Sequence, residues 1–429
     1  MSEWVNATVE DVTKYQKAGG TPLATNPNFY NGDIPFVVIE DITNSFHYLT
    51  KTSKTLNKIG LDSSAAWFID EPHVLYSMYA TVGKPIISKI SCATNQAIIA
   101  LKENELIEQE FLYYQLLFIR PSVYKFTAQT TQLNLNAGVV KRLPISYPKD
   151  KSLQIKIIKI LQTIDQTIEK TEALIEKYQQ IKAGLMNDLF TRGIGADGKL
   201  RPPREQAPAL YQQTPIGWIP KDWKVKSCQD VFNIDSGITL GLHRRPKYQP
   251  RPYLRVANVF KGKIVLKEIS YLEASDEENL KYSLNTNDIL LIEGHANIQE
   301  IGRCALVKNN AEGMLFQNHL FRLKAIKISP IYGMYFLNSF IARKHWLTNC
   351  STSSGLNTIN RKMLGKMIFF VPSFNEQIEI EDRFNYSNKL IENESNFLYK
   401  VRYIKSGLMH DLLTGIVQVP INTTEAEHV

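Results

Sequence analysis

Two short stretches have the outline of cofactor-binding loops, and each lacks a part that the chemistry needs. NPNFY (Asn26–Tyr30) approaches the N-P-P-[FY] loop with which amino-methyltransferases hold a target amine, but its third position is asparagine. No glycine-rich strand–turn–helix for S-adenosylmethionine lies nearby, so an ordinary turn is the better interpretation. GADGKL (Gly195–Leu200) is too short for a phosphate-binding P-loop and has no Ser or Thr after its lysine.

A third stretch, NDILLIEGH (Asn287–His295), has the outline of a nuclease D-x(n)-E-x-K core. His295 stands where a lysine would help to stabilise the phosphorane charge, so we interpret the stretch as a buried strand with a polar end. The eight histidines show no H-x-x-x-H or H-E-x-x-H pair. The sequence therefore predicts no catalytic residue and no metal site.

Composition predicts a soluble, multidomain protein. The 429 residues exceed one ordinary hydrophobic core, which predicts two to four domains. No apolar run is long enough to span a membrane, and the N-terminus has no secretory pattern. The cysteines form no C-x-x-C pair, so we expect neither a thiolate zinc site nor disulfides, and a cytoplasmic location. They are Cys92, Cys228, Cys304 and Cys350.

Positive charge is concentrated in one part of the chain. The net charge is +8, and residues 207–372 alone carry a surplus of +10, because their 22 basic residues face 12 acidic ones. Residues 1–149 balance 13 basic against 13 acidic side chains. The surplus fits a nucleic-acid ligand, although net charge alone also fits many other proteins.

The chain repeats itself. IKAGLMNDLFT (Ile181–Thr191) returns as IKSGLMHDLLT (Ile404–Thr414), with eight of eleven positions identical 223 residues later. QLNLNAGVVKRLPISYP (132–148) likewise faces GLNTINRKMLGKMIFFVP (355–372). Upstream the similarity weakens, as where EWVNATVEDV (3–12) meets DWKVKSCQDV (222–231). Each half therefore reads as a variable, strand-rich block followed by a long helix.

Both predicted helices carry a heptad seam in the same phase. Apolar residues alternate steps of four and three, and adding 223 to each number in the first helix reproduces the seam of the second, polar interruptions included. We predict that the two helices pack antiparallel on each other as a coiled coil, the alternative being that each packs on its own domain. The predicted interface residues are Ile157, Leu161, Ile164, Ile168, Ile175, Leu185, Ile380, Phe384, Ile391, Leu398, Val401 and Leu408.

Taken in order, these motifs resemble the specificity subunit of type I restriction-modification systems over essentially the whole chain. The residues that carry the resemblance are the duplicated GLM-x-D-L-[FL]-T helix ends, the TPIGWIPKDW stretch before the second block, the helix starts where a proline precedes a Gln-Ile pair, and the LNLN and LNTIN stretches. One departure is that Glu3 and Trp4 begin where the second block has already used TPIGWIP, so the first domain looks trimmed or starts late.

The resemblance implies an α/β (α+β) fold with a pseudo-twofold repeat, in which two long antiparallel helices separate two target recognition domains. The expected boundaries are 1–149 and 218–372 for recognition domains 1 and 2, 150–191 and 373–414 for the spacer helices, 192–217 for a flexible linker, and 415–429 for a tail. Each domain is expected to read one half of a bipartite, asymmetric site in double-stranded DNA.

The resemblance also assigns partners. The helices are expected to dock two methyltransferase subunits, with restriction subunits in the full complex and no membrane contact. S-adenosylmethionine, ATP and Mg²⁺ would belong to those subunits, and this chain would carry no cofactor and no catalysis. Two other hypotheses remain open: an adaptor whose globular blocks bind protein, and a DNA-modifying enzyme with degenerate motifs.

In the first block, lysines and amides are the candidate DNA ligands. TKTSKTLNK offers lysines for phosphates, and QTTQLNLN (129–136) offers amides for bidentate contacts to adenine. The lysines could equally form a solvated face, and the amides could close a turn. The candidates are Lys51, Lys54, Lys58, Thr130, Gln132 and Asn134.

In the second block, LHRRPKYQPR (Leu242–Arg251) places arginine forks beside a tyrosine, and such forks match guanine as well as phosphate. CSTSSGLN (350–357) occupies the place of QTTQLNLN. Because of the charge surplus, we expect this block to supply more of the salt-dependent affinity. The candidates are Arg244, Arg245, Lys247, Tyr248, Arg251, Arg255, Ser353 and Asn357.

Overall fold

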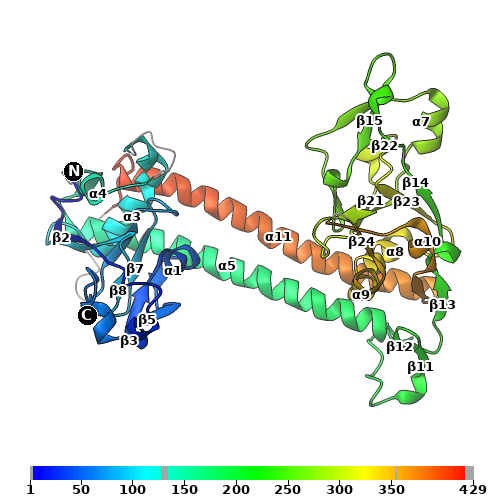
Figure 1. Cartoon of the computed structure of the whole chain (residues 1–429), viewed down its shortest axis with the longest axis horizontal. Coiled ribbons are helices and arrows are strands. Elements are labelled where there is room, and N and C mark those ends of the chain that lie inside the picture. Colours follow the sequence, from blue (N-terminus) through cyan, green and yellow to red (C-terminus); the bar gives the residue numbers. More distant parts are fainter. Residues whose placement is uncertain (1–2, 127–133, 354, 421–429) are drawn as a thin grey trace. The chain divides into compact units, whose positions relative to one another are not determined.

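The structure is a computed structural model that describes residues 3–126, 134–353 and 355–420 (Figure 1). It contains two compact units: unit 1 comprises residues 1–173 and 395–429, and unit 2 comprises residues 174–394. The two long helices, α5 (Lys151–Thr191) and α11 (Phe374–Leu413), each contribute one part to each unit. Within the described ranges, no helix combines the length and apolar character that crossing a membrane requires.

Unit 1 is built on two main sheets. The larger has the order β2–β9–β6–β7–β4, with bounds Thr13–Ala18, Ile98–Glu103, Val74–Ser77, Pro85–Ser88 and Tyr48–Leu49. The smaller has the order β5–β3–β8, with bounds Lys54–Leu56, Tyr30–Val37 and Ala93–Thr94. A separate antiparallel pair joins β1 (Trp4–Thr8) to β10 (Pro144–Pro148). The helices are η1 (Pro27–Phe29), α1 (Ile39–Asn44), α2 (Lys58–Asp62), α3 (Gln109–Ile119), η2 (Arg120–Phe126) and α4 (Ala137–Lys141).

Unit 2 contains the corresponding sheets and several additions. Its four-stranded sheet has the order β14–β23–β19–β21, with bounds Phe232–Ser236, Leu320–Ala325, Ile289–Ile292 and Cys304–Leu306. A three-stranded sheet has the order β18–β15–β22, with bounds Ser270–Glu273, Pro250–Leu254 and Leu315–Phe316. The pair β13 (Lys224–Ser227) and β26 (Ile368–Val371) corresponds to β1 and β10.

The additions in unit 2 are small pairs and short helices. A further three-stranded sheet has the order β20–β25–β24, with bounds Gly294–His295, Leu356–Thr358 and Ser351–Ser353, and β16 (Val259–Phe260) pairs with β17 (Lys263–Ile264). The helices are η3 (Pro208–Leu210), α6 (Cys228–Val231), η4 (Leu242–Arg244), η5 (Val256–Asn258), α7 (Asp276–Tyr282), η6 (Asn309–Ala311), α8 (Pro330–Leu337), α9 (Phe340–Asn349) and α10 (Arg361–Lys366).

The predicted internal repeat is confirmed at the level of topology. β2–β9–β6–β7 and β14–β23–β19–β21 have the same order, and β5–β3–β8 matches β18–β15–β22, including the parallel pairs β3–β8 and β15–β22. Local caps repeat as well, because the carboxylate of Asp11 accepts the backbone N–H of Thr8 while that of Asp230 accepts the N–H of Ser227. The mixed α/β character and the two strand-rich halves agree with the expected fold class.

The recurrent glutamine at each helix start has a structural task. Gln154 is fully buried, and its amide donates to the carbonyl of Pro148 at 2.9 Å and accepts from the N–H of Glu108 at 2.8 Å. Gln377 does the same for Pro372 at 3.1 Å and Ser329 at 2.8 Å. A buried amide satisfies backbone groups that would otherwise lie unpaired, so each glutamine joins its helix to the preceding domain.

Within each unit the two long helices run antiparallel to each other. In unit 1, Asp165 pairs with Lys405 and Glu172 pairs with Arg402. Residues later in α5 therefore contact residues earlier in α11, as antiparallel helices require. In unit 2, Lys182 donates to Asn388 at 2.5 Å. None of the twelve predicted interface positions is exposed. The outermost ones serve domain cores too: Ile157 and Leu161 lie in the core of unit 1, and Ile380 and Phe384 in that of unit 2.

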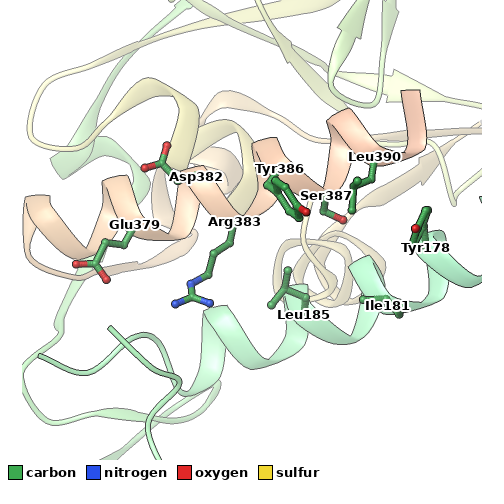
Figure 2. A pocket seen from close by; sticks show the side chains of 9 residues that line it. All are labelled: Tyr178, Ile181, Leu185, Glu379, Asp382, Arg383, Tyr386, Ser387 and Leu390. Carbon is green, nitrogen blue, oxygen red and sulfur yellow. The ribbon is translucent and has the colours of Figure 1, made fainter. Parts of the chain in front are cut away.

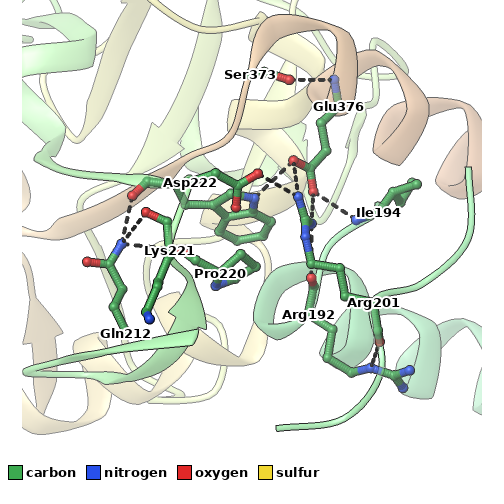
Figure 3. Close-up of polar contacts among 10 residues, drawn as sticks. Arg192, Ile194, Arg201, Gln212, Pro220, Lys221, Asp222, Ser373 and Glu376 are labelled. Carbon is green, nitrogen blue, oxygen red and sulfur yellow. Dashed lines mark hydrogen bonds and ion pairs between the residues drawn. The ribbon is translucent and has the colours of Figure 1, made fainter. Parts of the chain in front are cut away.

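The predicted flexible linker 192–217 is instead a structured segment, which is a correction. Strand β11 (Tyr211–Thr214) pairs with β12 (Gly217–Pro220), and Arg201 reaches back to Glu376 of α11 (Figure 3). The buried Glu376 carboxylate also accepts from the N–H of Ile194 at 2.8 Å and from the indole of Trp223 at 3.0 Å.

The end of α5 is fitted to this cluster. Gly193 has φ +63°, and a Cβ there would lie 2.2 Å from the Glu376 carboxylate and 2.4 Å from the Trp223 ring. Only glycine satisfies both the backbone angle and the space. Composition suggested flexibility here because Gly and Pro were counted without the partners that fix them.

Candidate nucleic-acid interface

A basic loop in unit 2, Gly241–Gln249, is held by carboxylates from neighbouring elements. Both terminal nitrogens of Arg244 bond the carboxylate of Glu278 on α7, each at 2.6 Å. The hydrogen bonds from Arg244 lower the pKa of Glu278 to about 2, so its charge is present at any physiological pH. This bidentate pair attaches the start of the loop to α7.

The end of the loop is held by Glu273 of β18. Its carboxylate accepts the backbone N–H groups of Lys247 at 2.8 Å, Tyr248 at 3.1 Å and Gln249 at 2.8 Å. These bonds, the one from Lys247 first, lower the pKa of Glu273 below its usual value. The backbone at the end of the loop is therefore fixed by Glu273, while the side chains of Arg245, Lys247 and Tyr248 are exposed.

Three of the arginines predicted as DNA ligands contact protein groups within unit 2. Arg244 is engaged with Glu278, and Arg251 pairs with Asp276 at 2.7 Å. The guanidinium of Arg255 lies 3.5 Å from a backbone carbonyl. Arg244 uses both terminal nitrogens of its fork on Glu278, so it lacks the free donors that bidentate recognition of guanine requires.

The loop presents different side chains to solvent. Arg245 and Lys247 are exposed, and neither is in an ion pair within the part of the chain that the structure describes. Tyr248 is 89% exposed and Leu242 is 78% exposed. Arg245, Lys247 and Tyr248 are therefore the predicted residues whose side chains are exposed in this loop, and Leu242, which was not predicted, is exposed in it as well.

Asn357 has a structural position that the sequence interpretation did not foresee. It is only 7% exposed, accepts from the hydroxyl of Thr352 at 2.9 Å and donates to the carbonyls of His295 and Ala296. Its amide holds β20, β24 and β25 together, so it is not free to bond a base. Ser353 lies in β24.

In unit 1, two of the predicted lysines are available. Lys51 and Lys54 are exposed and form no ion pair among the described residues, whereas Lys58 pairs with Asp62 at 3.3 Å on the exposed surface of α2. Beside Lys54 lies a pocket of about 320 Å³, which is also lined by Ala24, Tyr30, Asn31, Ser53 and Thr55. The cationic strand end and the polar pocket together form a concave surface in this unit.

The amide-rich stretch is only partly visible. Thr130 and Gln132 lie outside the described residues, and Asn134 is exposed just before α4. The next asparagine, Asn136, caps α4 by accepting the N–H of Val139 at 2.9 Å, as Asn360 caps α10 through the N–H of Met363 at 2.8 Å. The repeated asparagines at the end of LNLN and LNTIN are thus helix caps.

The stretches with an outline of catalysis have structural partners. Asn26 caps the short turn η1, and Asp288 accepts the N–H of Asn285 beside the fully buried strand β19. Burial raises the pKa of Asp288. Glu293 pairs with His319 at 2.9 Å. Among the described residues, no three His, Cys, Asp or Glu side chains are placed to hold a metal ion.

A groove of about 600 Å³ runs between the two long helices in unit 2 (Figure 2). From α5 it is lined by Tyr178, Ile181 and Leu185, and from α11 by Glu379, Asp382, Arg383, Tyr386, Ser387 and Leu390. Ile181 is 52% and Tyr386 67% exposed, although both are large and apolar in character. Large exposed side chains of apolar character gathered in one groove are uncommon on the surface of a monomeric protein.

Comparison with known protein families identifies the molecule. The family model for the type I restriction modification DNA specificity domain matches residues 1–180 and 220–401. The chain belongs to this family. The two matches fall on the two halves of the repeat, so the two strand-rich domains are the two DNA specificity domains that the family description names.

Curated relatives are similar over different lengths. The MjaVIII specificity subunit of Methanocaldococcus jannaschii is 23% identical over 423 residues, which cover 97% of this chain and 93% of that protein. The MjaIX specificity subunit of the same organism is 23% identical over 266 residues, which cover 61% of this chain and 59% of that protein. The chain thus matches one relative almost end to end and spans little more than half of the other.

Solved structures share the fold. The S subunit of a type I restriction-modification system from M. genitalium superposes with a TM-score of 0.53 at 14% identity, covering 98% of this chain and 97% of that one. A structure from work on complex assembly and conformational transition of the type I R-M system gives a TM-score of 0.61 at 13% identity, covering 96% and 98%.

The sequence interpretation missed the acidic side of the interface. Glu273 and Glu278 lie 24 to 34 residues from the loop groups that they bind, so no local spacing announces the contact. The run DEE at Asp276–Glu278 after Ser275 does predict a helix start, because acidic side chains stabilise helix N-termini, but it does not indicate a basic partner.

Proposed function

We propose that this chain is the sequence-reading subunit of a type I restriction-modification enzyme, with each specificity domain binding one half of a bipartite, asymmetric site in double-stranded DNA. The observation that carries the proposal is the repeat of one strand topology with unlike surface loops. A common scaffold with a cationic loop in one copy and a lysine-edged pocket in the other is suited to reading two different half-sites.

In unit 2 the proposed DNA ligands are Arg245, Lys247 and Tyr248, because their side chains are exposed on a backbone fixed by Glu273. In unit 1 they are Lys51 and Lys54, with the pocket beside Lys54 as the place for a base edge. Lys58, Asn134 and Ser353 stay secondary candidates, as do Thr130 and Gln132. Cationic groups without a protein partner are the ones that can exchange counterions for phosphate.

The chain is further proposed to have no catalytic activity and to work with two methyltransferase subunits and with restriction subunits. The groove of Figure 2 supports docking, because it combines exposed apolar residues with charged groups at its edge. S-adenosylmethionine, ATP and Mg²⁺ would be bound by those subunits. The proposed division of the chain keeps recognition domains at 1–149 and 218–372 and helices at 150–191 and 373–414.

The proposal is tested by binding the complex of this chain and its methyltransferase partner to DNA at several salt concentrations, once methylome sequencing has defined the site. For the variant R245A/K247A we expect the slope of log K against log[salt] to fall by about 2, because two phosphate contacts are lost. K51A/K54A is expected to reduce it less, since unit 1 carries less positive surplus. The matched control is K149A, because the amine of Lys149 is paired with Glu3 and this lysine is not among the candidate DNA ligands.

The outcomes are distinct. Equal slopes for wild type and R245A/K247A would remove the basic loop from the interface. A complex that modifies no sequence at all, or purified chain that methylates or cleaves DNA on its own, would overturn the proposed function.

A further inference from the structure

The basic loop carries two large side chains of apolar character that folding leaves exposed. Leu242, at the start of η4, is 78% exposed, and Tyr248 is 89% exposed. Leaving such side chains in water forgoes the favourable free energy that burial of apolar surface provides. In Figure 1, β15, β22 and α7 form the end of the unit-2 domain farthest from α9 and α10, and the loop precedes β15 at this end.

This surface is held in a fixed shape. Glu273 accepts three consecutive backbone N–H groups at the end of the loop, and Arg244 is bonded through both terminal nitrogens to Glu278. A flexible loop would lose conformational entropy on binding, whereas this one is already ordered. The acidic groups that order it bond the loop backbone and Arg244, and among the described residues neither forms an ion pair with the side chain of Arg245 or Lys247.

The charge of the basic loop indicates which kind of macromolecule binds there. Arg245 and Lys247 are exposed in the same short loop as the two apolar side chains. Exposed apolar side chains in a loop with exposed cations are complementary to a polyanion with a hydrophobic interior, which is the chemistry of stacked bases between phosphates. A protein surface of mixed charge is matched less well.

We infer that Leu242 and Tyr248 form a wedge that enters a groove of the DNA and unstacks a base step in the half-site read by unit 2. The inference rests on the proposed function and adds a mechanism to it. Arg245 and Lys247 hold the flanking phosphates. Glu273, Glu278 and Arg244 are positioning residues that keep the wedge in shape and do not touch the DNA.

The test places 2-aminopurine at successive steps of that half-site and follows its fluorescence on binding the wild-type complex. We expect a rise at one step, because unstacking relieves quenching. L242A/Y248A is expected to abolish the rise and to weaken half-site binding about tenfold, with the salt slope unchanged. L280A is the matched control, since Leu280 is 86% exposed on α7 but lies outside the loop.

The positioning residues have their own readout. E273Q keeps the size of the side chain but weakens its bonds to the three N–H groups. We expect faster hydrogen exchange of those amides, a smaller fluorescence rise and an unchanged salt slope. A variant that lost affinity only through misfolding would instead change the unfolding transition of unit 2.

Three results would overturn the inference. The fluorescence could stay flat at every step while R245A/K247A still lowers the salt slope, in which case the proposed function stands and the wedge does not. L242A/Y248A could bind DNA like wild type. The same variant could keep its DNA affinity but no longer sediment together with the methyltransferase partner, which would make the basic loop a protein-docking surface.

Discussion

The two units contain the same helix-to-helix contact, with one atom changed. Lys405 of α11 meets Asp165 of α5 at 2.5 Å in unit 1, and Lys182 of α5 meets Asn388 of α11 at 2.5 Å in unit 2. The two lysines are 223 residues apart, and so are their partners. The repeat has therefore kept the place and length of the contact and exchanged a carboxylate for an amide.

The surroundings differ accordingly. In unit 1, Asp165 also accepts the hydroxyl of Tyr114 at 2.9 Å, and His47 lies 3.8 Å away, stacked between Tyr48 and Tyr113 at 4.2 and 4.0 Å. In unit 2, Asn388 donates to the hydroxyl of Tyr335 at 2.7 Å, and burial, reinforced by the charge of Lys261, lowers the pKa of Lys182. In unit 1 the cost of burying the charge of Lys405 is offset by the carboxylate of Asp165. In unit 2 the described residues place no opposite charge beside Lys182.

Removing the lysine of unit 1 should have the largest effect. K405M leaves the Asp165 charge buried without its partner, and we expect a loss of about 3–5 kcal/mol in the free energy of unfolding of unit 1. Denaturant unfolding, with hydrogen exchange assigned to peptides of each unit, measures it. The double variant D165N/K405M should recover most of the loss. A loss of less than about 1 kcal/mol in K405M would contradict a buried charge pair.

The matching substitutions in unit 2 are K182M and N388D. Both should change the free energy of unfolding less than K405M does, and N388D should raise it rather than lower it. K182M removes a buried charge that has no anion, so we expect the free energy of unfolding to change by no more than about 1 kcal/mol. N388D supplies the missing carboxylate and is expected to raise the stability of unit 2 by about 1 kcal/mol. Hydrogen exchange of the unit-2 peptides of α5 and α11 reports both. Destabilisation by N388D would show that the amide is required there.

The smallest effect is a pH dependence confined to unit 2. Because the folded pKa of Lys182 lies below its unfolded value, the unfolded chain binds more protons between the two values, and stability contributed by this group rises with pH in that window. The stability difference between wild type and K182M should therefore shift in favour of wild type as the solution is made alkaline. Unfolding curves from pH 7 upward test this, and a difference that stays constant would place Lys182 in solvent.

The repeat made much of this architecture readable in advance. Identical helix ends and seams in one phase predicted the paired helices, since the 3.5-residue period is a local property of the chain. The contact between Asp165 and Lys405 could also have been predicted. Asp165 and Asn388 align in the repeat, and an antiparallel pair brings the beginning of one helix to the end of the other. What the spacing could not tell was that Asp165 would also serve Tyr114.

The loop contacts were beyond such reasoning. Arg244 and Arg245 are neighbours of the same residue type, yet one is tied to Glu278 and the other is free. That difference depends on where β18 and α7 bring their carboxylates, which is set by sheet topology and not by the local sequence. The burial of Asn357 was not predicted for the same reason, because its partners His295 and Ala296 lie more than 60 residues away.

The buried glutamines at the helix starts make the attachment of each long helix to its domain independent of the surface loops. Gln154 and Gln377 bond backbone atoms alone, so their contacts do not depend on which side chains the surface loops carry. New loop sequences can therefore be grafted onto either domain without re-tuning its joint to the helices. A change of DNA target would then alter the surface loops and leave the backbone contacts at the helix starts unchanged.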